Sequence, residues 1–166
     1  LFRLRERGLT TRADKRDDHG SGLFLAEGDL VVERAFRAGC RPVAALADEQ
    51  RVPPIAHELG GDGFIGGGDI RQLVTGLGMP HPIVAIFERP PRPSAISLLA
   101  RTHRLVIVEQ VDNPANIGGI VRNAAGLGWD GLLLDRESGD PLSRRSLRVA
   151  MGTTFELPHA RTADLD

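Results

Sequence analysis

Residues 111–131, "VDNPANIGGIVRNAAGLGWDG", carry the pattern that decides the fold of this chain. Apolar residues recur there at positions 117, 120, 121, 124 and 125. This i, i+3, i+4, i+7, i+8 series predicts an amphipathic helix that packs on a sheet. Asn116 stands where the N-cap of this helix is expected, and Pro114 stiffens the turn ahead of it.

Two glycines, Gly118 and Gly119, fall in the first turn of the predicted helix. Each costs about 1 kcal/mol relative to alanine, so the bare backbone needs a reason. One reason is the approach of an anion to the unpaired N–H groups of the helix N-terminus. Arg122 follows one turn later on the same side and would complete a phosphate or ribose site. Close packing of the helix, with Arg122 solvated, explains the same residues, and both interpretations stay open here.

A G-x-G-x-x-G pattern also occurs in this stretch, at Gly126, Gly128 and Gly131. A dinucleotide-binding loop follows a strand and opens a helix, whereas these glycines end a helix and lead into a strand. We therefore interpret them as a turn that caps the helix C-terminus.

Outward from this stretch, strand-like and helix-like segments alternate along the chain. Strands are expected at 22–28, 41–48, 63–67, 81–89, 104–111, 129–135 and 153–160. Further helices are expected at 29–39, 49–61, 68–78, 97–103 and 141–152. This alternation predicts an α/β fold with helices packed on sheets.

A proline-rich segment at 90–95, "PPRPSA", divides the chain. Its three prolines in six positions stop both a helix and a central strand. We therefore expect a linker there, between an α/β domain at 21–89 and a second one at 96–166. Residues 1–20 are expected to form a charged arm, in which a solvated helix is favoured over an RNA contact because acidic residues alternate with the arginines.

The composition, 41% hydrophobic and 26% charged, is typical of a soluble globular protein. The single Cys40 excludes an internal disulfide, and the N-terminal stretch lacks the apolar core of an export signal, so a cytoplasmic protein without a membrane span is expected. The five histidines show no metal-ligand spacing, and no metal is predicted. A net charge of −1 argues neither for nor against a nucleic-acid partner.

Two segments resemble a known family. Residues 111–135 and 140–158, the latter "DPLSRRSLRVAMGTTFELP", are similar to the first motif and the following helix of the SpoU/TrmH-type RNA 2′-O-ribose methyltransferases of the SPOUT superfamily. Asn116, Gly118 and Arg122 meet the family's N-x-G-x-x-x-R pattern. Residues 24–39, "FLAEGDLVVERAFRAG", resemble the start of its N-terminal substrate-binding domain.

This resemblance implies an α/β fold in which a ribosomal-protein-like, RNA substrate-binding domain precedes a SPOUT parallel-sheet domain. It also implies transfer of a methyl group from S-adenosylmethionine to a ribose 2′-hydroxyl of rRNA or tRNA, by a homodimer. Asn116 and Arg122 would be catalytic, and Gly118 and Gly119 would lie against the RNA. Arginine stays protonated at neutral pH because its pKa is very high, so it is a poor base. We therefore favour a role for Arg122 in positioning the substrate and stabilising negative charge, although a role as base stays open.

The family's second and third motifs, which form the cofactor pocket and the trefoil knot, lie closer to the C-terminus than this sequence extends. We therefore expect a C-terminally truncated chain with only the first half of the SPOUT domain, the knot missing. No residue of this chain is assigned to S-adenosylmethionine. The chain alone is expected neither to bind the cofactor nor to methylate, whereas the full-length protein does both.

Three arginines, Arg144, Arg145 and Arg148, share one side of the predicted helix at 141–152. They are candidates for RNA phosphate contacts, or else form a solvated face paired with Glu137 and Asp140. Two other functions stay open: a non-catalytic RNA- or ribosome-binding module, and an unrelated α/β protein that binds a nucleotide phosphate at the turn before Arg122.

Overall fold

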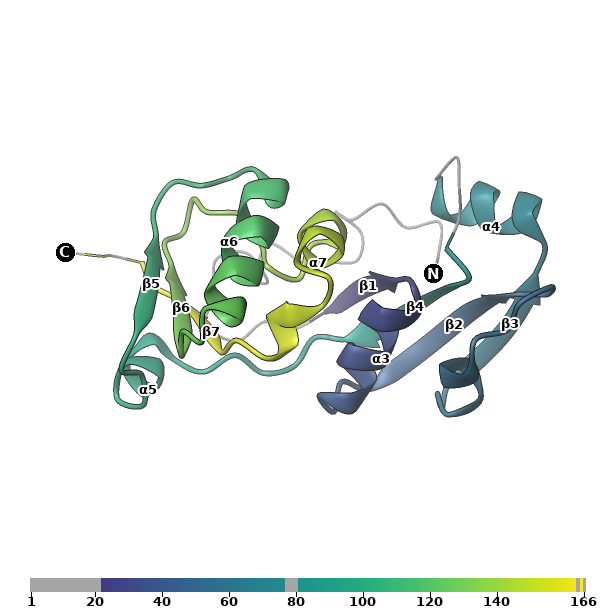
Figure 1. Cartoon of the computed structure of the whole chain (residues 1–166), viewed down its shortest axis with the longest axis horizontal. Helices are drawn as coiled ribbons and strands as arrows, with labels where there is room; N and C mark the ends of the chain where they lie inside the picture. The colour runs from purple at the N-terminus through teal and green to yellow at the C-terminus, as the bar shows by residue number, and fades with distance from the viewer. Residues whose placement is uncertain (1–21, 77–80, 164, 166) are drawn as a thin grey trace.

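The computed structural model describes residues 22–76, 81–163 and 165, so the arm expected at 1–20 lies outside the described residues. Two sheets lie along the long axis of the molecule, and α7 lies between α6 and the first sheet (Figure 1). In the described part of the chain, no helix has the length and apolar character that crossing a membrane requires.

The first sheet has four strands in the order β1-β4-β2-β3. Strand β4 pairs antiparallel with both β1 and β2, whereas β2 and β3 are parallel. The elements are β1 (Leu23–Glu27), α3 (Asp29–Arg37), β2 (Pro42–Asp48), β3 (Asp62–Gly66), α4 (Gly68–Thr75) and β4 (Ile83–Glu88). Three of the strands and both helices fall within the segments for which the sequence predicts them, and β3 begins at Asp62, one residue before its expected segment.

The helix expected at 49–61 is wrong, because only one 3-10 turn, Pro54–His57, forms there. Pro53 and Pro54 lack N–H groups, which prevents the helix from extending back toward residue 49. At the other end, the chain turns through two glycines into β3, which begins at Asp62.

The second sheet is fully parallel and has the order β5-β6-β7. Its elements are α5 (Ala95–Leu99), β5 (Leu105–Val108), α6 (Pro114–Gly126), β6 (Gly131–Leu134), α7 (Arg144–Ala150) and β7 (His159–Arg161). The strand expected at 153–160 begins only at His159, because a 3-10 turn occupies Thr153–Phe155 and Pro158 has no N–H to donate to a ladder.

Asn116 is not the N-cap of α6, and that prediction is wrong. Helix α6 begins at Pro114, and the side-chain Oδ1 of Asn113 accepts a hydrogen bond from the N–H of Ala115 at 2.9 Å. Both asparagines stand within two positions of Pro114, but proline fits the first helical position, where its missing N–H is no loss. Asn116 therefore lies inside the helix, with its side chain exposed.

The region of α7 packs into the apolar core of the first sheet, whereas the strands of the second sheet pack with α6 in a separate core. Leu142 and Leu147, which lie just before and within α7, pack in the same cluster as Phe24 and Phe87 of the first sheet. The rings of Phe24 and Phe87 stack with their centroids 5.4 Å apart. The α/β class with a parallel sheet is thus as predicted, and the two sheets are joined by packing as well as by the chain at 89–94.

Candidate functional site

The carboxyl ends of the parallel strands carry the polar loops of the second sheet. In open parallel sheets, ligands commonly bind at this edge. The loop at 109–113 leads from β5 to α6, and the loop at 135–143 leads from β6 to α7. Both α6 and α7, which hold the residues singled out from the sequence, therefore begin at this edge.

Hydrogen bonds join these two loops closely. The carboxylate of Asp135 accepts from the N–H of Gln110 at 2.9 Å and from that of Ser138 at 2.8 Å. The Ser138 hydroxyl accepts from the N–H of Val111 at 3.2 Å, and the N–H of Gly139 donates to the Val111 carbonyl at 2.7 Å. Burial opposes ionisation of Asp135, but these hydrogen bonds and the nearby positive charge of Arg161 lower its pKa.

One side of α6 is open to solvent. Asn116, Gly119 and Arg122 follow one another three residues apart on this side, and the side chains of Asn116 and Arg122 are exposed. A Cβ atom added at Gly119 would meet no atom within 4 Å. We call these three residues the outer face of α6.

A neighbouring side of α6 packs on α7, and Gly118 lies at that contact, one turn before the exposed Arg122. A Cβ atom at Gly118 would stand 2.5 Å from the Ser146 carbonyl oxygen and 2.8 Å from Cβ of Val149. Helix packing therefore explains the absence of a side chain at Gly118. The two glycines thus separate the two interpretations: Gly118 serves packing, and only Gly119 leaves the helix surface bare for a ligand.

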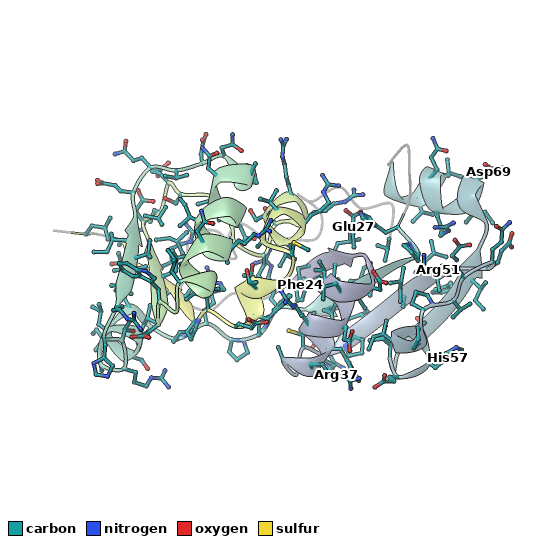
Figure 2. All side chains as sticks on the ribbon, in the orientation of Figure 1. Phe24, Glu27, Arg37, Arg51, His57 and Asp69 are labelled. Atoms are coloured by element: carbon teal, nitrogen blue, oxygen red, sulfur yellow. The ribbon has the colours of Figure 1, made fainter. Side chains whose placement is uncertain are left out.

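The arginines of α7 have a partner in the first sheet. Arg144 Nε donates to Glu27 Oε1 at 2.6 Å, and Arg148 Nη1 lies 3.5 Å from Glu27 Oε2. Glu27 ends β1 at the side of the first sheet that faces α7, and its side chain is only 1% exposed (Figure 2). The alternative in which these arginines pair with Glu137 and Asp140 is wrong for Asp140, because Asp140 pairs with Arg89.

Arg145 differs from its two neighbours. It is exposed on α7 and forms no ion pair with any residue that the structure describes. Of the predicted RNA contacts on this helix, Arg145 is free in the described structure, Arg148 is partly engaged, and Arg144 is held by the first sheet.

Sequence reasoning missed Asp135, Ser138 and Arg161. The guanidinium of Arg161, the last residue of β7, donates to three backbone carbonyls of the loop that contains the other two. Arg161 directly follows the strand expected at 153–160, and no spacing in the sequence singles it out. Among the described residues, no group of three or more His, Cys, Asp or Glu side chains is placed to hold a metal ion.

Comparison with known proteins identifies proteins that are similar in sequence to this chain. Residues 103–166 match the SpoU rRNA Methylase family. An uncharacterized tRNA/rRNA methyltransferase of Mycobacterium bovis is 34% identical over 156 residues, which cover 91% of this chain and 54% of the relative. The 23S rRNA (guanosine(2553)-2'-O)-methyltransferase RlmP of Bacillus subtilis is 28% identical over 148 residues, covering 89% of this chain and 57% of that protein.

A solved structure shows the same fold. The SpoU methyltransferase AviRb from Streptomyces viridochromogenes, in complex with the cofactor AdoMet, superposes with a TM-score of 0.71 at 25% identity, over 86% of this chain and 56% of that one. The resemblance to SpoU-type methyltransferases is therefore confirmed. The chain spans about half the length of the curated relatives it matches.

Proposed function

We propose that this chain is part of an RNA 2′-O-ribose methyltransferase that uses S-adenosylmethionine. The observation that carries the proposal is the outer face of α6: Asn116, Gly119 and Arg122 stand open in a segment that matches the SpoU methylases. The names of RlmP and AviRb, and the cofactor bound to AviRb, support the reaction and the methyl donor.

For this reaction the protein mainly has to position the reacting groups and stabilise the charge that develops. A ribose hydroxyl is a weak nucleophile, so it must be held in line with the methyl group and lose its proton. We propose that Arg122 contacts the RNA phosphate or the attacking oxygen and stabilises its developing negative charge. The amide of Asn116 can both donate and accept a hydrogen bond, which suits it to orient the ribose.

S-adenosylmethionine supplies the methyl group, but no residue of this chain is assigned to hold it. The polar groups of Asp135, Ser138 and the backbone of residues 110 and 111, which lie at the carboxyl edge of the second sheet, already form hydrogen bonds with one another. We propose that the cofactor site and the knot belong to the further length that the matched relatives have.

The remaining assignments are parts of the same proposal. Residues 21–89 would be a ribosomal-protein-like domain that binds structured rRNA or tRNA, residues 90–95 the linker, and residues 96–166 the first half of the SPOUT domain. Arg145 and Arg148 would add phosphate contacts beside α6, and RNA affinity would then fall as salt rises. The full-length enzyme would be a cytoplasmic homodimer.

The test compares this chain with the full-length protein. Calorimetric titration of S-adenosylmethionine is expected to show binding by the full-length protein alone. Transfer of labelled methyl groups to ribosomal RNA or tRNA, with the site located by mass spectrometry, is expected to yield a 2′-O-methylated nucleotide.

Two variants sharpen this test. Arg122→Ala in the full-length protein is expected to lower kcat by about 100-fold, by analogy with the loss of one oxyanion-stabilising donor. Arg101→Ala is the matched control, because Arg101 is an exposed arginine whose side chain bonds only Ser97 within the described structure. RNA binding without cofactor binding or methyl transfer by the full-length protein would replace the enzyme with the non-catalytic RNA-binding module.

A further inference from the structure

A buried arginine ends the last strand of the parallel sheet. Arg161 is only 2% exposed. Its guanidinium donates to the carbonyl oxygens of Asp135, of Ser138 at 2.8 Å and of Gly139 at 3.0 Å. Burial lowers the pKa of Arg161, because removing the charged guanidinium from water costs free energy. An apolar side chain would leave these three carbonyls without their donor, so the arginine serves the loop whose carbonyls it binds.

Those carbonyls belong to the segment 135–139, which in turn holds the end of β5. Besides the bonds of Asp135 and Gly139 to the backbone of residues 110 and 111, the Ser138 hydroxyl donates to the Val108 carbonyl at 3.3 Å. The N–H of Asp135 donates to the same carbonyl at 3.1 Å. The two segments are so close that a Cβ atom at Gly139 would stand 2.9 Å from the Asp112 carbonyl oxygen.

The segment that is held in this way has a strained backbone. Gln110 has a φ of 53°, in the left-handed region that residues other than glycine rarely adopt. Such a conformation persists only where surrounding bonds enforce it. The bond from the Gln110 N–H to Asp135 is one of these, and Asn113, three residues later, caps α6.

We propose that Arg161 is a positioning residue for methyl transfer. By binding three carbonyls it fixes the segment 135–139, which fixes the segment 108–112, and this sets where α6 begins and where Asn116 and Arg122 point. Arg161 itself lies buried beneath the loops and contacts no substrate. The inference rests on the proposed function, because the residues that it positions are those proposed to meet the RNA.

The first experiment measures hydrogen exchange of the full-length protein without RNA or cofactor. Arg161→Lys keeps the charge but loses the planar fork, and Arg161→Met loses both. In both variants we expect the amides of Gln110, Val111 and Gly139 to exchange at least about 10-fold faster, with amides of β4 changed less than about 2-fold. Ser138→Ala, which removes the link between the segments without touching Arg161, is expected to accelerate Gln110 and Val111 alike.

The second experiment measures methyl transfer by the same variants. A misplaced Arg122 would slow the chemical step, so we expect kcat of Arg161→Lys to fall about 10-fold, with KM for RNA within about 2-fold of the wild type. The matched control is Arg101→Lys, because Arg101 is exposed and lies beyond the linker from the first sheet. It should change neither kcat nor KM for RNA.

The outcomes separate the inference from the function on which it rests. Unchanged exchange in Arg161→Lys and Ser138→Ala would overturn the proposal, and so would faster exchange with an unchanged kcat. A fall in kcat with an equal fall for Arg101→Lys would show a general loss of activity and would also overturn it. A wild-type protein that transfers no methyl group would overturn the proposed function itself, leaving the exchange data to show whether Arg161 holds the loops.

Discussion

At the level of single residues, His159 shows how burial sets a charge. Burial, followed by the positive charge of Arg92, lowers its pKa from 6.5 to about 4, against the opposing influence of Asp140. Nδ1 lies 3.4 Å from the Leu157 carbonyl, and Nε2 has no partner among the described residues. The imidazole is therefore neutral in the folded protein at neutral pH.

This pKa predicts a loss of stability in mild acid. An unfolded histidine takes up a proton near pH 6.5, whereas the folded one does so only near pH 4, so the free energy of unfolding should fall as pH drops through this window. The full effect is about 3 kcal/mol, from about 1.4 kcal/mol per pKa unit. Urea denaturation at pH 7 and pH 4.5 measures it.

His159→Gln is the matched variant for that measurement. Because glutamine does not titrate, the variant should lose much less stability between pH 7 and pH 4.5 than the wild type does. The lowered pKa of Asp140 places its own contribution below its ordinary value of 3.8, outside this window. Equal losses in the two proteins would contradict the assignment to His159.

At the level of secondary-structure elements, α6 presents two adjacent glycines to two different environments. Gly118 faces α7 at a distance that excludes a Cβ atom, and Gly119 faces open space. The same substitution at the two positions should therefore have opposite effects. This contrast separates the structural role of the helix from its surface role.

Gly118→Ala should destabilise the protein by about 1–3 kcal/mol, because the methyl group meets the Ser146 carbonyl and forces α6 and α7 apart. Gly119→Ala should stabilise it by up to about 1 kcal/mol, since alanine favours the helix and has room. Chemical denaturation of both variants measures the difference. A loss of stability in Gly119→Ala would contradict this prediction, because it would show that the added methyl group meets another part of the protein.

Gly119→Ala also tests the outer face of α6. If RNA approaches the bare backbone there, the more stable variant should bind RNA more weakly than the wild type. Fluorescence anisotropy with a labelled RNA measures this affinity. Unchanged RNA binding by Gly119→Ala would remove Gly119 from the proposed contact surface, while leaving Arg122 and Asn116 to be tested separately.

At the level of the whole molecule, a buried ion pair and the apolar packing of α7 on the first sheet join the two halves of the chain. Arg89, directly after β4, pairs with Asp140, and both side chains are almost fully buried, at 2% and 4% exposure. The buried Glu27 joins β1 to α7 through Arg144 and Arg148, whose side chains are 28% and 41% exposed. The proposed RNA-binding region and the proposed catalytic region are thus held in one orientation.

Arg89→Met should lower the free energy of unfolding by about 3–5 kcal/mol, because it leaves the Asp140 carboxylate buried without its cation. Arg37→Met is the control, since the pair of Arg37 with Glu58 is exposed at the outer end of α3 and should matter little (Figure 2). Thermal or urea unfolding of both variants makes the comparison. Similar small effects would show that Asp140 finds another partner or is protonated.

The sequence alone determined the local elements of this protein. The apolar spacing after Ile117 predicted α6, and the apolar runs predicted strands of both sheets, because periodicity reflects backbone geometry over a few residues. Asn116 and Arg122 were singled out by their places beside the two glycines and by the N-x-G-x-x-x-R pattern of the family that the sequence resembles. The cap of α6 was misplaced because two asparagines flank one proline, and only the backbone angles choose between them.

Only the tertiary structure decided what faces these elements. Gly118 needed to be bare because of Ser146, a residue of another helix, and Arg144 found its partner Glu27 at a separation of 117 residues. Arg161 depends on three carbonyls that converge only once β6 and β7 are paired. Such partners are set by packing between distant segments, and no local spacing in a single sequence encodes them.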